Sequence, residues 1–159
     1  MVGSISLFIN KSKEDEEIAA LHREATRLKD AGDWDKAIAA LQKAQNMMRR
    51  SNVANTTESW LRLPLFLQQG GRFDEAMEEF NRLLAETDAR IANEFSHQPE
   101  FAQYGFTHQV RATIYNKMRV ACKRQNLLDE TARYKALHDE YMGKDEQFRV
   151  AFEKYKKKR

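Results

Sequence analysis

The sequence predicts an all-α protein built from about three stacked helical hairpins, with a capping helix at its C-terminal end. Two prolines and six glycines in 159 residues leave little room for the turns of a β fold. A cassette also recurs, first as AGDWDKAIAALQKA (31–44) and then, 39 residues later, as GGRFDEAMEEFNRL (70–83). A repeat of this length is typical of stacked hairpins that bury one another's apolar faces.

The first hairpin is expected to begin after Ser12, whose hydroxyl can cap a helix that ends at Gly32. Residues 1–13 are therefore assigned to an N-terminal segment outside the repeats. Apolar residues with helical spacing predict the inward faces of both helices. These residues are Ile18, Leu21, Ala25 and Leu28 in the first helix, and Trp34, Ala37, Ile38, Leu41, Ala44 and Met48 in the second.

The second hairpin is expected to start at a helix capped by Thr56 or Thr57 and ended by the glycine pair at 70–71. Pro64 lies inside this helix and predicts a kink near Trp60, because proline lacks a backbone N–H. The run WLRLPLFL (60–67) is apolar except at Arg62. Burial between neighbouring hairpins is the favoured interpretation, and an open groove containing Leu61 and Leu65 is the alternative.

A long return helix is expected from Phe73 to about Phe95, with an interruption at residues 96–99. An aromatic insertion follows at 101–106, and then a helix whose inward residues are Val110, Ile114, Met118 and Cys122.

A degraded third cassette covers residues 125–137, with Asn126 in place of the glycine. Asparagine tolerates the left-handed backbone that such a turn requires. The repeat region is thus assigned to residues 14–142. A separate capping helix with a basic tail is expected over 144–159, with Phe148, Phe152 and Tyr155 on one face.

The net charge of +3 comes from the end of the chain. Five of the last six residues are basic, and the remaining 22 basic and 24 acidic side chains leave a net charge of −2. A nucleic-acid-binding face is therefore not expected on the body of the protein. We find no secretory signal and no apolar run long enough for a membrane span, so a cytoplasmic location and no membrane partner are expected.

These features resemble the tetratricopeptide repeat, whose first helix carries W-x2-L-G-x2-Y and whose turn carries a Gly, aromatic, Asp and Ala cassette. Trp60 and Leu63 match the first two positions, whereas Pro64 replaces the glycine and Leu67 the tyrosine. The intervals of 39 and 55 residues between cassettes exceed the family's value of about 34, which predicts an irregular stack.

The resemblance implies a concave surface on the first helices of the hairpins that binds a protein or peptide. Lysines and asparagines that clamp a C-terminal carboxylate in some family members are mostly replaced here, so that clamp is not expected. The groove-facing residues that the resemblance implies are His22, Thr26, Lys29, Leu61, Arg62, Leu65, Gln68, Asn116, Lys117, Val120 and Lys123.

Catalysis has little support in the sequence. Glu94 and His97 form a lone E-x-x-H, whereas the helical di-iron sites need two such motifs and further glutamates. The single cysteine, Cys122, lies on an apolar stripe and is expected to be a core thiol. We therefore expect a non-enzymatic interaction module, without a cofactor or metal, that binds another protein or peptide through the concave face, the 96–106 insertion, or both.

Three alternatives stay open. A nucleic-acid-associated adaptor would use the basic tail, and a helical enzyme would place its site near Glu94, His97 and His108. A homodimer is also compatible with the sequence, because the long return helix and the aromatic insertion could pair two chains.

Overall fold

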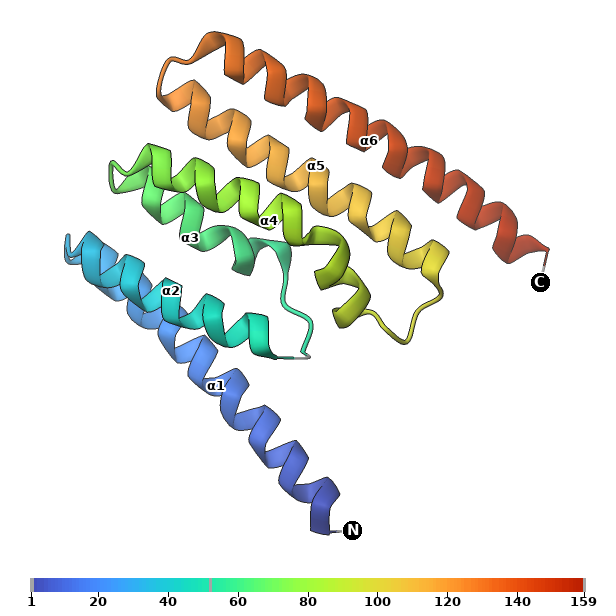
Figure 1. Ribbon diagram of the computed structural model, residues 1–159, viewed down its shortest axis with the longest axis horizontal. Coiled ribbons are helices and arrows are strands. Elements are labelled where there is room, and N and C mark those ends of the chain that lie inside the picture. The colour runs from blue at the N-terminus through green and yellow to red at the C-terminus, as the bar shows by residue number, and fades with distance from the viewer. Residues whose placement is uncertain (1, 52, 159) are drawn as a thin grey trace. The chain divides into compact units, whose positions relative to one another are not determined.

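The computed structural model describes residues 2–51 and 53–158, with side chains from residue 13 onward, and this part of the chain contains six α-helices and no strand (Figure 1). Met1 and Arg159, which belong to the predicted terminal segments, lie outside the described residues. The all-α prediction is confirmed. The helices are α1 (Val2–Asp30), α2 (Trp34–Arg50), α3 (Thr57–Gln69), α4 (Phe73–Glu94), α5 (Glu100–Arg124) and α6 (Leu128–Lys157).

The chain divides into two compact units, residues 1–72 and 73–159. In the first unit, α1 and α2 form an antiparallel hairpin and α3 packs against α2 (Figure 1). The predicted inward face of α2 is confirmed from Ala37 to Met48, and Ile18 and Ala25 are buried on α1. Most of α3 is buried as well. Its buried apolar side chains are Trp60, Leu61, Leu63, Phe66 and Leu67.

In the second unit α5 packs against both α4 and α6, and successive helices run in opposite directions (Figure 1). The buried apolar residues of α4 lie at helical spacing and are Ala76, Phe80, Leu83 and Ile91. Ile114, Met118 and Cys122 are fully buried on α5, as predicted, whereas Val110 is only half-buried.

The same turn follows α1, α3 and α5. Gly32, Gly71 and Asn126 have φ values of 80°, 83° and 57°, which lie in the left-handed region. In each turn this residue donates to the carbonyl three residues earlier, and the next residue donates to the carbonyl five residues before it. This hydrogen-bond pair is the Schellman motif, which satisfies two carbonyls at the end of a helix. The predicted role of Asn126 is confirmed.

Pro64 leaves the carbonyl of Trp60 without its usual helical donor, because proline has no N–H. Gln45 of α2 replaces that donor: its Nε2 donates to the Trp60 carbonyl oxygen at 3.2 Å, and both residues are 2% exposed. Of the two predicted N-caps, Thr56 is the one observed, since its hydroxyl accepts from the Ser59 N–H at 3.1 Å. A side chain from a neighbouring helix thus allows a proline in the middle of α3.

Three predicted boundaries are wrong. The first helix begins at Val2 rather than after Ser12, so residues 2–13 belong to α1. The aromatic stretch 101–106 forms the first turns of α5, because its Gly105 is a packing position rather than a loop residue. A separate helix after Gly143 does not exist, since α6 continues through it. One exposed glycine costs a helix only about 1 kcal/mol, which packing against α5 outweighs.

Candidate functional site

Three of the eleven expected groove residues form a polar cluster on α1 and α3. The Arg62 guanidinium donates to the His22 carbonyl oxygen at 3.0 Å and to the Thr26 hydroxyl at 2.6 Å. Its Nη1 also lies 2.9 Å from His22 Nδ1. Because a guanidinium only donates, Nδ1 must accept, and the neutral His22 ring carries its proton on Nε2.

This cluster is held against an aromatic pair. The Arg62 guanidinium lies 5.2 Å from the centre of the Phe66 ring, and Lys29 Nζ lies 5.5 Å from the same centre. Trp34 meets Phe66 edge-on at 5.9 Å. Burial and the neighbouring Arg62 charge lower the pKa of His22, and burial lowers the pKa of Arg62. His22 therefore stays neutral in its contact with Arg62 at neutral pH.

The other expected groove residues do not join this cluster. Leu61 and Gln68 are 1% and 7% exposed and so are not available to a partner on an open surface, whereas Leu65 is half-buried. The four residues expected on α5 belong to the second unit. Of these, Asn116, Lys117 and Val120 are half-buried, and Lys123 is exposed.

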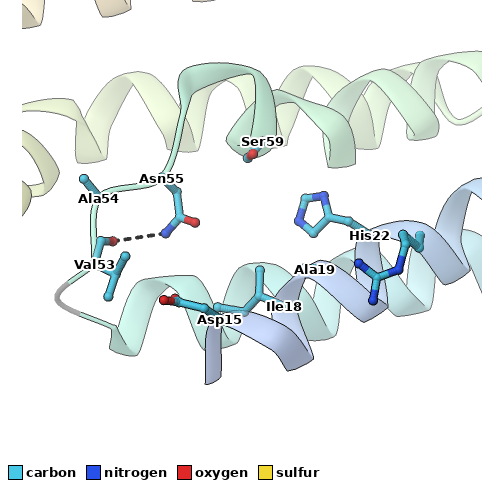
Figure 2. A pocket seen from close by; sticks show the side chains of 9 residues that line it. Asp15, Ile18, Ala19, His22, Val53, Ala54, Asn55 and Ser59 are labelled. Carbon is cyan, nitrogen blue, oxygen red and sulfur yellow. Dashed lines mark hydrogen bonds between the residues drawn. The ribbon is translucent and has the colours of Figure 1, made fainter. Parts of the chain in front are cut away.

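A cleft of about 490 Å³ lies beside the cluster, between α1 and the segment that leads into α3 (Figure 2). The His22 ring points into it, and Asn55 closes one end by donating to the Val53 carbonyl oxygen at 3.1 Å. The lining mixes one carboxylate, one guanidinium, amide and hydroxyl groups with small apolar side chains. It consists of Asp15, Ile18, Ala19, His22, Arg23, Val53, Ala54, Asn55 and Ser59.

The second unit contains an apolar hollow of about 330 Å³ between the start of α5 and the last turns of α6. Aromatic rings form most of its wall. We call this site the aromatic pocket, and its lining residues are Pro99, Phe101, Phe148, Ala151, Phe152 and Tyr155.

Phe101 contacts each of the other three rings of the aromatic pocket. Its ring centre lies 6.2 Å from that of Phe148, 5.7 Å from that of Phe152 and 5.0 Å from that of Tyr155. Phe148 fits closely over Gly105, where an added Cβ would lie 2.2 Å from the ring. Phe101 and Tyr155 remain 38% and 43% exposed. The pocket is thus built by packing but is open to solvent.

Exposed lysines occur on the part of α6 that lines the aromatic pocket and at its C-cap. Lys156 Nζ lies 4.6 Å from the centre of the Phe152 ring and 3.8 Å from the Glu153 carboxylate. Lys154 and Lys158 are exposed and have no acidic partner among the described residues. On its α6 side the pocket therefore combines an apolar wall with a positive edge, whereas on the α5 side the exposed Glu100 precedes Phe101.

Further along the same pair of helices, His108 is packed among aromatic rings. Its ring centre lies 4.6 Å from that of Tyr104 and 6.2 Å from that of Tyr141. The His108 Nδ1 atom is buried without a hydrogen-bond partner in the described part of the chain. Burial, and then the charges of Lys144 and Arg111, lower the pKa of His108. This ring is neutral at neutral pH, and its surroundings are those of a packing residue.

The E-x-x-H motif spans the end of α4, and the single cysteine lies in the core. Glu94 is the last residue of α4, and His97 lies beyond the helix end, so the E-x-x-H motif does not share a helix face. Cys122 is fully buried, and burial raises the pKa of its thiol, as expected of a core cysteine. Within residues 13–51 and 53–158 no group of three or more His, Cys, Asp or Glu side chains could hold a metal ion.

Comparisons of the chain with family models, with curated proteins and with solved structures found no match. In the described residues, no helix combines the length and the apolar character needed to cross a membrane.

The sequence pointed to both walls of the aromatic pocket but not to their contact. It placed Phe148, Phe152 and Tyr155 on one helix face, and it separated residues 101–106 from the following helix. The missed signal is the spacing of Phe101 and Gly105, which lie four residues apart and so share a face once α5 starts at Glu100.

Proposed function

We propose that this protein is a non-catalytic interaction module that binds a partner protein or peptide through the aromatic pocket. The observation that carries the proposal is a hollow lined by four aromatic rings that stays partly open to solvent. Clustered aromatic side chains supply large apolar contact areas and are enriched among the residues that dominate binding energies. The polar cluster of His22, Thr26 and Arg62 would serve as a second, weaker contact surface.

A photo-crosslinking experiment tests this function. Benzoylphenylalanine is placed at Phe152 and, as the control, at Ala136, which is exposed on α6 about 24 Å away along the helix. We expect Phe152 to yield a defined crosslinked protein in the native cell, and Ala136 not to. Loss of that product in a Phe101→Ala background, with an unchanged circular dichroism spectrum, would tie the capture to the pocket.

Equal crosslinking from both positions, or none from either, would contradict the proposed function. A product that survives Phe101→Ala would place the partner on another surface.

The second candidate function is a nucleic-acid-associated adaptor, and the exposed lysines of the last α6 turn favour it. Such lysines also complement the negative end of a helix, which is a sufficient structural reason for their presence. Deleting residues 156–159 and measuring retention on immobilised RNA separates the two candidates. Retention that depends on the tail would support the adaptor.

A further inference from the structure

We infer that the aromatic pocket binds an acidic amphipathic segment of a partner protein, whose bulky apolar side chains enter the pocket while its carboxylates meet the nearby lysines. This inference rests on the proposed function and adds the chemistry of the partner. It combines the apolar lining of the pocket with the distribution of charge around α6.

The charge distribution follows from helix geometry, in which successive residues differ by about 100° around the axis. Phe148, Phe152 and Tyr155 therefore fall within an arc of about 60°. Measured from the centre of this arc, Lys156 lies about 70° to one side and the C-cap residue Lys158 about 90° to the other, whereas Lys154 lies about 130° away. We call Lys156 and Lys158 the lysine rim. Lys157 falls on the opposite face of α6 and provides a control with the same charge.

Among the described residues, the charges of the lysine rim are only weakly neutralised. The one ion pair among its members in the described residues joins Lys156 to Glu153, with both side chains largely exposed. Such exposed pairs contribute between zero and about 1 kcal/mol and exchange readily for another carboxylate. A partner with acidic residues beside its apolar anchors would therefore complement both parts of the site.

The ring geometry favours a protein segment over a nucleic acid. Phe148 and Phe152 stack on each other at 5.8 Å with an interplanar angle of 19°, and Lys156 lies over the Phe152 ring. Phe101 meets its three neighbours at angles between 41° and 64°. Base stacking needs a free ring face, whereas these rings surround a hollow. A hollow of this kind suits leucine or aromatic side chains from one face of an amphipathic helix.

Three synthetic peptides test the inference. They share the same leucine and tryptophan anchors at helical spacing and differ only in whether the flanking residues are acidic, neutral or basic. Fluorescence anisotropy with the full chain measures each affinity at low and at high salt. We expect the acidic peptide to bind about tenfold more tightly than the neutral one at low salt, and most of this difference to disappear at high salt.

Matched variants locate the interaction. Lys156→Gln is expected to weaken binding of the acidic peptide severalfold and to leave binding of the neutral peptide unchanged. Lys157→Gln should change neither affinity by more than a small factor. Phe101→Ala is expected to weaken binding of both peptides by about tenfold or more, because it removes the ring that contacts the other three rings of the pocket. Unchanged circular dichroism and unfolding midpoints identify variants that remain folded.

The outcomes separate the inference from the proposed function. If acidic and neutral peptides bind equally and Phe101→Ala weakens both, the acidic partner is overturned while the interaction module stands. If no peptide binds and Phe152 captures nothing in the crosslinking experiment, both fail. Binding of an RNA oligonucleotide or an anionic vesicle that exceeds that of the acidic peptide and depends on the lysine rim would also overturn the inference. Self-association that Phe101→Ala abolishes would do the same.

Discussion

Removing the Gln45 side-chain amide should destabilise the first unit, and Pro64→Ala should reverse most of that effect. Gln45 supplies the hydrogen bond that Pro64 cannot give to the Trp60 carbonyl. A buried acceptor left without a donor costs about 1–3 kcal/mol. Gln45 Oε1 is itself buried without a partner in the described residues, so Gln45→Met also removes an unsatisfied atom. We therefore expect Gln45→Met to lower the unfolding free energy by about 1–2 kcal/mol.

Pro64→Ala restores an N–H four residues after Trp60, so the carbonyl regains its helical donor. In this background Gln45→Met should cost about 1 kcal/mol less than in the wild type. Urea unfolding followed by tryptophan fluorescence reports on the correct unit, because Trp34 and Trp60 are the two tryptophans of the chain and both precede residue 73. Gln42→Met, at an exposed position of α2, is the matched control and should change stability by less than about 0.5 kcal/mol. If the effects of Gln45→Met and Pro64→Ala on the unfolding free energy add within about 0.5 kcal/mol, the two residues do not act on the same carbonyl and the reasoning is refuted.

Three further predictions concern two glycines, His22 and the α5–α6 contact. Nothing lies within 4 Å of a Cβ added at Gly32 or Gly143, so neither alanine would clash. Gly32→Ala should lower the unfolding free energy by about 1–2 kcal/mol, because residue 32 has a left-handed backbone. Gly143→Ala, inside α6, should raise it by about 0.5–1 kcal/mol, because alanine favours a helix more than glycine does. Because the pKa of His22 is lowered in the folded state, the unfolded state binds more protons, so stability should fall as the pH drops below about 6.5. His22→Gln should reduce that fall. Gly105→Ala should lower stability by about 1–3 kcal/mol by displacing the Phe148 ring, and Phe148→Leu should relieve part of the loss.

Each of these predictions has a result that contradicts it. If Gly32→Ala and Gly143→Ala change the unfolding free energy in the same direction, the left-handed turn carries no strain. A pH dependence of urea unfolding that is the same in wild type and His22→Gln would assign the proton uptake to another group. If Phe148→Leu does not raise the unfolding free energy of the Gly105→Ala protein, the close contact between residue 105 and the Phe148 ring does not control its stability.

The helices that the sequence predicted well are those whose ends carry chemical signals. Gly32, Gly71 and Asn126 mark turns because few residues adopt a left-handed backbone without strain, and Thr56 marks an N-cap because its hydroxyl can accept a backbone N–H. The wrong boundaries are those at which one local signal was given too much weight. From the sequence, Gly143 predicts the end of a helix. In the structure α6 continues through it, because α6 packs against α5 along this stretch.

The site was predictable only in fragments for a related reason. Helical spacing shows which side chains share a face, as with His22 and Thr26, but not which face of another helix they meet. The Arg62 contact that joins these residues spans 40 and 36 positions of the chain, and the Phe101 contacts with α6 span more than 40. Such contacts follow from helix packing, which a single sequence does not display.

The continuity of α6 also decides how the positive tail can meet a partner. A disordered tail of the same composition could wrap around many anionic surfaces, but it would lose conformational entropy each time it bound. On an unbroken helix the lysines advance by about 1.5 Å per residue and keep fixed angles about the axis, so the charge pattern is pre-organised. Under the inference drawn above, a partner would be selected for a matching arrangement of carboxylates, and the tail would act as a template instead of a flexible tether.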